Sequence, residues 1–181
     1  LYDQTNDIRY KSWFDTRNIT TPVVGTLTLL VKYPGNPKLY SAVTNYVNQP
    51  KIFRISEMYL IAAEGYAQAN EIAKASEYLN ALEASRIHQY PGQAFQSKES
   101  VMAEIQNERQ RELIAEGHRL FDLKRWNLAV KRGEPQQADL CLLPGATTTA
   151  LVKDANDNKF VWPIPRHEVD ANPQIVQNPG Y

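Results

Sequence analysis

Two neighbouring stretches with apolar residues at helical spacing constrain the fold of this chain more than any other feature. They are RISEMYLIAAEGYAQAN, residues 54–70, and EIAKASEYLNALEASRI, residues 71–87. Residues three and four apart share one face of a helix, so each stretch predicts an amphipathic helix whose apolar stripe needs a partner. The stripes comprise Ile55, Met58, Tyr59, Ala62, Ala63 and Tyr66 in the first stretch and Ile72, Ala75, Leu79 and Leu82 in the second. A tight turn near residues 70–71 predicts that the two helices form a hairpin.

This hairpin resembles a tetratricopeptide repeat, which is a pair of antiparallel helices. Its small, aromatic, small and large positions are taken by Ala63, Tyr66, Ala75 and Leu79. One such repeat cannot bury its own apolar face, so further helices must pack against it. The sequence therefore predicts a mainly α fold, with a tetratricopeptide-like helical hairpin plus further helices, long irregular loops and little strand.

The chain divides into three zones by composition. Residues 1–53 are a loop-rich, aromatic segment in which only TLTLLVKY, residues 26–33, alternates like a strand. Residues 54–132 form a helical core, and residues 133–181 are rich in proline, which prevents long regular elements. With 181 residues, 43% of them hydrophobic, the chain is expected to form one domain with a true core.

A third helix is predicted from about residue 98 to about residue 116, after the start signal SKES at residues 97–100. One face of it runs through Val101, Ile105, Glu108, Glu112 and Glu116. Acids that continue an apolar stripe at i,i+4 spacing repel one another, so this face needs cations from elsewhere in the fold. Arg54, Arg119 and Arg125 are the predicted partners, whereas Arg109 flanks the face and Arg111 projects elsewhere.

The run ERQRELIAEGHRLFDLKRW, residues 108–126, has three possible interpretations. A nucleic-acid patch is disfavoured because its acids nearly match its bases and would repel phosphate. A catalytic acid–base site using Glu112 or Glu116 with His118 is conceivable, but no nucleophile motif, zinc-binding helix or phosphate loop stands nearby. The favoured interpretation is a structural network of buried ion pairs. Its predicted members are Arg54, Glu108, Arg109, Glu112, Glu116, His118, Arg119 and Arg125.

Charge and cysteine content exclude several classes of protein. Lys+Arg and Asp+Glu both number 20, so the chain lacks the positive field that draws proteins to nucleic acid. The single cysteine, Cys141, excludes an internal disulfide framework. No stretch approaches the roughly 20 apolar residues of a membrane span.

KDANDNKF, residues 153–160, lacks the acid spacing, central glycine and distal glutamate of a calcium loop, so it is interpreted as a polar turn. No metal or cofactor is predicted.

Four stretches in order closely resemble the SusD/RagB family, the surface lipoproteins of nutrient-uptake systems in Gram-negative bacteria. They are NDIRYKSWF (6–14), FRISEMYLIAAEGYAQAN (53–70), ERQRELIAEGHRLFDLKRW (108–126) and VWPIPRHEVDANPQIVQNPGY (161–181). The resemblance implies that the chain is the C-terminal part of a longer protein. The missing N-terminal part would carry a lipidated cysteine, the only link to the membrane, and most of the tetratricopeptide-like helices.

The resemblance implies a non-enzymatic function at the cell surface. Such a protein captures a glycan, or in some branches a peptide, and passes it to a TonB-dependent, SusC-like transporter in the outer membrane. The family motifs lie in the helical framework, so its binding residues cannot be carried over. Sugars pack on flat aromatic rings and bond to polar side chains, which makes Tyr40, Tyr46 and Asn48 the candidate ligand-binding residues. A tetratricopeptide-like scaffold that binds a protein is the alternative.

Overall fold

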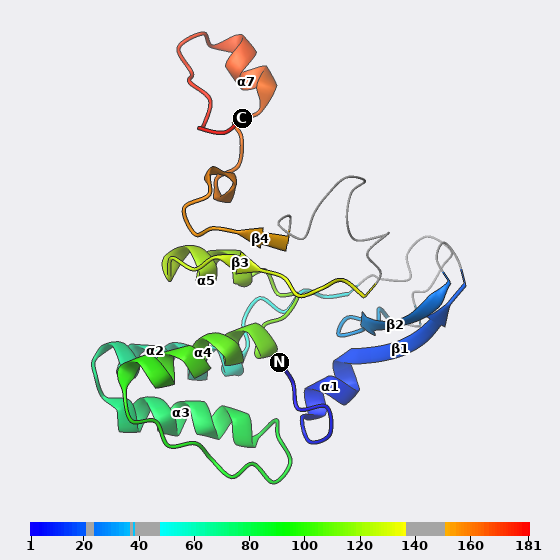
Figure 1. The fold of residues 1–181 in the computed structure, drawn as a ribbon, viewed down its shortest axis with the longest axis vertical. Coiled ribbons are helices and arrows are strands. Elements are labelled where there is room, and N and C mark those ends of the chain that lie inside the picture. Colours follow the sequence, from blue (N-terminus) through cyan, green and yellow to red (C-terminus); the bar gives the residue numbers. More distant parts are fainter. Residues whose placement is uncertain (21–23, 37, 39–47, 137–150) are drawn as a thin grey trace. The chain divides into compact units, whose positions relative to one another are not determined.

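The computed structural model describes residues 1–20, 24–36, 38, 48–136 and 151–181 (Figure 1). They form two compact units, Leu1–Gly117 and His118–Tyr181. The three zones defined by composition remain a description of the sequence, because the boundary between the units falls inside the predicted helical zone. No helix in the described part of the chain is long and apolar enough to cross a membrane.

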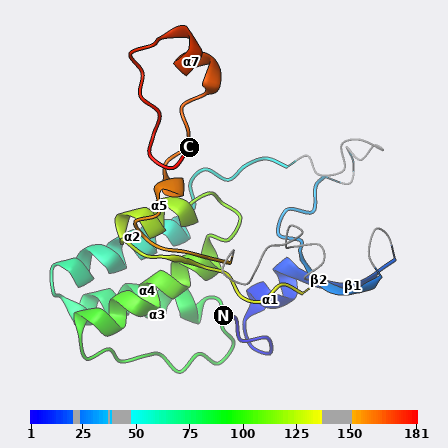
Figure 2. The ribbon, with the colours of Figure 1, turned by 45° about the horizontal axis from the view of Figure 1, so that its top comes forward.

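The first unit is built around three packed helices, α2 (Ile55–Gln68), α3 (Ile72–Ala84) and α4 (Lys98–Glu112), which Figure 2 shows from a second direction. The predicted hairpin is confirmed: α2 and α3 are joined by a tight turn in which Asn70 adopts a left-handed φ of 61°. The core consists of Leu60, Ala63, Ala67, Ala75, Leu79, Leu82, Val101, Met102 and Ile105. Small alanines on both sides of the α2–α3 contact let the helix backbones approach each other closely.

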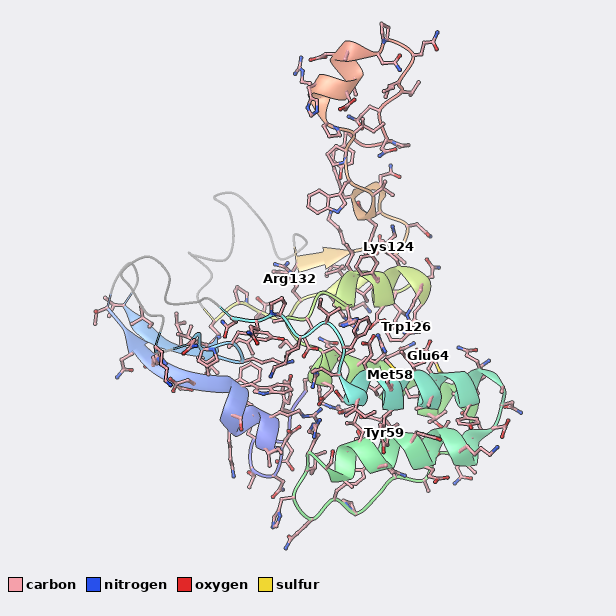
Figure 3. All side chains as sticks on the ribbon, turned by 180° about the vertical axis from the view of Figure 1, so that it is seen from behind. Met58, Tyr59, Glu64, Lys124, Trp126 and Arg132 are labelled. Atoms are coloured by element: carbon pink, nitrogen blue, oxygen red, sulfur yellow. The ribbon has the colours of Figure 1, made fainter. Side chains whose placement is uncertain are left out.

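The predicted stripe on α2 was partly wrong. Its buried residues are Ser56, Leu60, Ala63 and Ala67, whereas Ile55 is 73% exposed and Met58 is 43% exposed. Figure 3 shows Met58 and Tyr59 on this helix. At 100° per residue, Ile55 and Met58 lie on the side of the helix away from its buried residues, so α2 carries apolar side chains outside the face that it buries. Periodicity detects both faces, but only the packing of α3 and α4 decides which one is covered.

Helix α4 begins where the sequence predicted and ends earlier. Ser97 and Ser100 form a capping box, in which each backbone amide donates to the other residue's hydroxyl at 3.2 Å. The helix stops at Glu112 rather than residue 116, because Ala115 and Gly117 adopt left-handed φ values of 60° and 85° that no α-helix contains.

Replacing Ser97 with alanine should lower the free energy of unfolding by about 1 kcal/mol, because the first turn of α4 would lose its side-chain acceptor. Chemical denaturation measures this change. Ser76→Ala is the matched control, since the Ser76 hydroxyl only donates to the Ile72 carbonyl within α3 and alanine is the better helix former. Equal stability of the two variants would contradict a role for the capping box.

The N-terminal segment precedes these helices as a helix and a hairpin. Helix α1 (Ile8–Trp13) is capped by Asp7, whose side chain accepts from the Arg9 amide. Strands β1 (Phe14–Ile19) and β2 (Gly25–Leu30) then pair in antiparallel register, from Phe14 opposite Leu30 to Ile19 opposite Gly25. The predicted strand is thus confirmed over residues 26–30, but the prediction of irregular loop was wrong for residues 8–19. FDTRNI alternates poorly, and pairing with β2 makes it a strand.

The second unit consists of short elements and a tied-down tail. Helix α5 (Arg119–Arg125) is followed by the paired two-residue strands β3 (Val130–Lys131) and β4 (Val152–Lys153), the 3-10 helix η3 (Asn158–Phe160) and helix α7 (Arg166–Ala171). The tail returns to η3: the Asn178 amide donates to the Trp162 carbonyl at 2.7 Å, and the Tyr181 hydroxyl donates to the Val161 carbonyl at 2.9 Å.

Candidate functional site

A network of buried charges joins the N-terminal segment to α4 in the first unit. Glu108 and Glu112, one turn apart on α4, are both fully buried. Between them and Asp7 lies Arg9, itself 2% exposed, whose Nη2 is 2.8 Å from Asp7 Oδ2 and whose Nη1 is 2.9 Å from Glu112 Oε2. Arg9 also pairs with Glu108. One guanidinium from the N-terminal segment thus neutralises carboxylates that would otherwise repel each other along α4.

Glu112 is the most heavily engaged carboxylate of the network. Besides Arg9, it accepts from Arg54 Nη1 at 2.8 Å and from Arg86 Nε and Nη2, both at 3.0 Å. Burial by itself raises a carboxyl pKa, but the hydrogen bonds and positive charges of Arg86 and Arg54 outweigh it and lower the pKa of Glu112 to about 2. Glu112 is therefore ionised throughout the physiological range.

The end of α4 is closed by a lysine from the segment after β2. Lys32 Nζ donates to the carbonyls of Glu112 and Ile114, both at 3.0 Å, and pairs with Glu116. A cation at a helix C-terminus satisfies its free carbonyls and interacts favourably with the helix dipole. The ammonium also lies 4.0 Å from the centre of the Trp13 ring. Burial lowers the pKa of Lys32, while Glu116 acts in the opposite direction.

A third group of charges joins α3 to α4. Arg111 Nη2 is 2.9 Å from Glu83 Oε1, Arg111 Nε is 2.7 Å from Glu108 Oε2, and the same guanidinium pairs with Glu104. Glu83 is fully buried and also contacts the Tyr90 hydroxyl. Burial, with the nearby Glu108 and Glu104 carboxylates, raises the pKa of Glu83 to about 7, although its contacts with Tyr90 and Arg111 act against this.

The structure brings together part of the set expected from the sequence. Arg54, Glu108, Glu112 and Glu116 lie in the network of the first unit. Arg109 is buried on α4, whereas His118, Arg119 and Arg125 belong to the second unit, where Arg125 Nε is 2.9 Å from Asp122 Oδ1. The prediction that Arg111 projects elsewhere was wrong. The sequence reasoning missed the cations Arg9, Lys32, Arg86 and Arg111.

The candidate ligand residues lie in and beside the segment after β2. Tyr40 and Tyr46 fall outside the described residues. Asn48 is half-buried, and its amide accepts from the Gly35 backbone N–H at 3.1 Å and donates to the Tyr33 carbonyl at 3.2 Å. These two bonds tie Asn48 to Tyr33 and Gly35. Ligand binding by the three residues remains a prediction.

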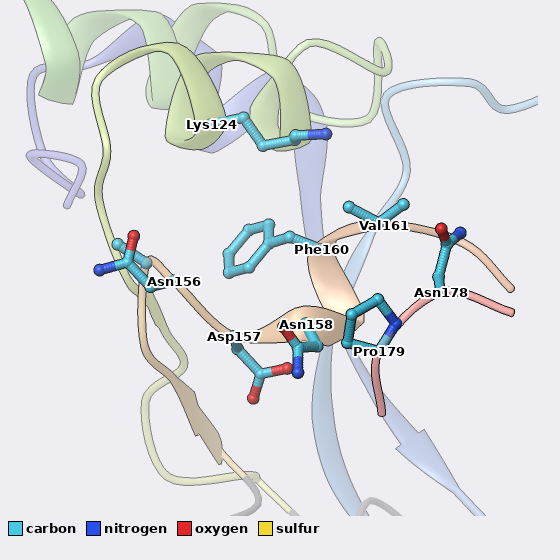
Figure 4. A pocket seen from close by; sticks show the side chains of 9 residues that line it. Lys124, Asn156, Asp157, Asn158, Phe160, Val161, Asn178 and Pro179 are labelled. Carbon is cyan, nitrogen blue, oxygen red and sulfur yellow. The ribbon is translucent and has the colours of Figure 1, made fainter. Parts of the chain in front are cut away.

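The second unit contains two adjoining hollows, which share Asp157 as a lining residue. Figure 4 shows the first, of about 270 Å³, between α5, the turn before η3 and the returning tail. Its main side chains are Lys124, Asn156, Asp157, Asn158, Phe160 and Asn178. The second hollow, of about 510 Å³, lies along β4 and is lined by Arg132, Glu134, Lys153, Asp154 and Asp157.

Local hydrogen bonds hold the wall that the two hollows share. The Asp157 carboxylate accepts from the Lys159 backbone N–H at 2.7 Å and from Lys153 Nζ at 3.3 Å, and these bonds lower its pKa. Phe160 follows on η3 and is only 8% exposed. The sequence interpretation of this stretch as a polar turn was incomplete. The sequence signal for a hollow here was the cluster of amide and acid side chains directly before Phe160.

The chain matches a known protein family over nearly its whole length. Residues 3–181 match the SusD family. The chain therefore belongs to the SusD family. A curated SusD-like protein of Formosa agariphila is 28% identical over 138 residues, which are 72% of this chain and 24% of that protein.

Solved SusD structures share the fold. A putative sugar binding protein of Bacteroides vulgatus is 33% identical with a TM-score of 0.68, over 97% of this chain and 36% of its own. A SusD superfamily protein of the same species is 25% identical with a TM-score of 0.71, again over 97% of this chain and 36% of its own. The mainly α, tetratricopeptide-like fold class is thus confirmed. The chain spans about a quarter to a third of the length of these SusD relatives.

Proposed function

We propose that this SusD chain belongs to a non-catalytic protein that captures glycans at the cell surface. It would deliver them to a SusC-like, TonB-dependent transporter while a lipid anchor holds it to the outer membrane. The observation that carries the proposal is the family match over residues 3–181, together with a relative described as a putative sugar binding protein that is 33% identical over 97% of this chain.

The chemistry of Glu112, one of the acid–base candidates of the sequence, supports a binding protein over an enzyme. A general acid or base needs a pKa near the working pH and access to the substrate. Glu112 has a pKa of about 2 and is fully buried. Arg9, Arg54 and Arg86 occupy its oxygens. Its carboxylate is therefore committed to the framework.

A titration experiment tests the proposal. We expect isothermal titration of the protein at its full natural length to show binding to at least one oligosaccharide in a panel of glycans, without release of a cleaved product. Tyr40→Ala and Tyr46→Ala are expected to weaken that binding about fivefold or more, because each removes an aromatic face. Hydrolysis of any glycan in the panel, or binding to none of them, would contradict the proposal.

The exposed apolar face of α2 favours a second candidate, a tetratricopeptide-like scaffold or a peptide-binding uptake protein. Ile55, Met58 and Ile61 are 73%, 43% and 51% exposed on this helix, and such faces commonly recognise other helices. A set of peptides in the same titration separates the candidates. Binding to peptides with no response to any glycan would favour this second function.

A further inference from the structure

We propose that the two hollows joined at Asp157 form a subsite for a segment of a neutral oligosaccharide. This inference rests on the proposed glycan-binding function and names the location and the class of sugar. Its lining residues all belong to the second unit and do not include Tyr40, Tyr46 or Asn48.

The shape suits a chain of sugars better than one small molecule. The first hollow, of about 270 Å³, adjoins a second of about 510 Å³ through their shared residue Asp157. Ligand sites commonly enclose about 300–1,000 Å³. A ligand that occupies both hollows must be extended and continue past Asp157, as linked sugar units do.

The lining of the first hollow combines an apolar floor with amides. Phe160 lines the hollow (Figure 4), and because it is 8% exposed it contributes a small aromatic surface there. Asn156 and Asn158 are exposed and carry both a donor and an acceptor. A sugar ring presents C–H groups on its faces and hydroxyls, which both donate and accept, around its edge. An aromatic ring flanked by amides matches both kinds of surface.

The charges around the hollows favour a neutral sugar. Lys124, Arg132 and Lys153 are opposed by Glu134, Asp154 and Asp157. Three positive and three negative side chains leave no net charge to attract an acidic polymer. A uronate or sulfate group placed beside Asp154 and Asp157 would be repelled, whereas hydroxyls bond to both kinds of side chain.

Hydrogen bonds within the protein hold the walls of the first hollow. The returning tail is tied to η3 by Asn178 and Tyr181 through the bonds described above. Gly180 adopts a φ of 90°, and a Cβ at this position would lie 3.1 Å from Asn158 Cβ. The tail therefore reaches this wall closely because a glycine stands there, and the wall is preformed.

Substitutions in the hollow test the inference by titration against neutral gluco-, manno- and xylo-oligosaccharides and against oligogalacturonate of equal length. Ala155→Trp should fill the hollow and weaken binding of the neutral glycan at least tenfold. Asn156→Ala removes one pair of hydrogen bonds and should weaken it about fivefold to tenfold. Asn107→Ala, at an exposed asparagine on α4 in the other unit, is the matched control and should bind as the unsubstituted protein does. Thermal unfolding of each variant confirms that it is folded.

The possible outcomes separate this inference from the proposed function. Glycan binding by the unsubstituted protein that neither Ala155→Trp nor Asn156→Ala weakens would overturn the subsite and leave glycan capture standing. Tighter binding of oligogalacturonate would overturn the neutral class. A protein that binds no glycan would refute the proposed function, and the subsite with it.

Discussion

Replacing Glu112 with alanine is expected to lower the free energy of unfolding by about 3–5 kcal/mol, the usual cost of removing one partner of a buried ion pair. The reason is that three guanidiniums, those of Arg9, Arg54 and Arg86, would lose their shared carboxylate. Arg9 is affected most, because it is 2% exposed and water cannot replace the missing acceptor. Urea denaturation followed by circular dichroism measures the change.

Glu71→Ala is the control for this experiment. Glu71 also pairs with a cation, Lys74 at 2.7 Å, but both side chains are about half exposed. Such surface pairs contribute about 0–1 kcal/mol. If Glu112→Ala unfolded at the same urea concentration as Glu71→Ala, the network would not stabilise the fold, and the interpretation of residues 108–126 as framework would have to be abandoned.

The second large effect is a loss of stability as the pH rises through about 7, caused by Glu83. The pKa of Glu83 is raised from 4.5 in the unfolded chain to about 7 in the folded protein. The folded state therefore binds the proton more tightly, and the stability that this contributes is complete below pH 4.5 and is lost as the pH rises through 7. The maximum slope is about 1.4 kcal/mol per pH unit.

Hydrogen-bond geometry supports a protonated Glu83. The Tyr90 hydroxyl has one proton but contacts two oxygens, Glu83 Oε2 and, at 2.8 Å, Asn80 Oδ1. The Asn80 oxygen is a true acceptor, because its amide is fixed by donating to the Gln93 carbonyl and accepting from the Gln93 N–H, both at 2.9 Å. Tyr90 satisfies both contacts if its hydroxyl donates to Asn80 and its oxygen accepts a hydrogen bond from the protonated carboxyl of Glu83.

The charges facing Glu83 point the same way. On α4, Glu104 and Glu108 repel a second negative charge, while Arg111 attracts it. Arg111 is shared among three carboxylates, because it also pairs with Glu104 and Glu108.

Glu83→Gln makes the effect measurable, because glutamine is a neutral side chain of the same shape. We expect the variant to match the unsubstituted protein near pH 5 and to become the more stable of the two above pH 7. Glu77→Gln, at an exposed position of the same helix, should follow the unsubstituted protein at every pH. Parallel stability curves for Glu83→Gln and the unsubstituted protein between pH 5 and pH 8.5 would refute the assignment.

Glu112 acts in a different pH window. Its pKa is lowered to about 2, so the stability it contributes is present above pH 4.5 and is lost as the pH falls through 2. Glu83 and Glu112 stand on neighbouring helices in one network, yet they change stability in opposite directions. The difference lies in their neighbours: Glu112 faces three guanidiniums, whereas Glu83 shares Arg111 with two other carboxylates.

The helical framework was largely predictable from the sequence. Apolar residues at three- and four-residue steps predicted the α2–α3 hairpin, and the serines at residues 97 and 100 predicted the start of α4. These features depend on contacts within a turn or two of helix, which sequence spacing reports directly. Strand β1 was missed because its strand character comes from pairing with β2, which is not a local contact, and its own residues alternate poorly.

By itself, the sequence determined that acids continue the apolar face of α4 and that cations must meet them. Only the tertiary structure decided which cations these are, since Arg9 and Glu108 lie 99 residues apart in the chain. The hollows around Asp157 likewise combine α5, the turn before η3 and the returning tail. Helix periodicity and caps are local, whereas an ion pair or a cavity wall depends on the path of the whole chain, which residue spacing does not record.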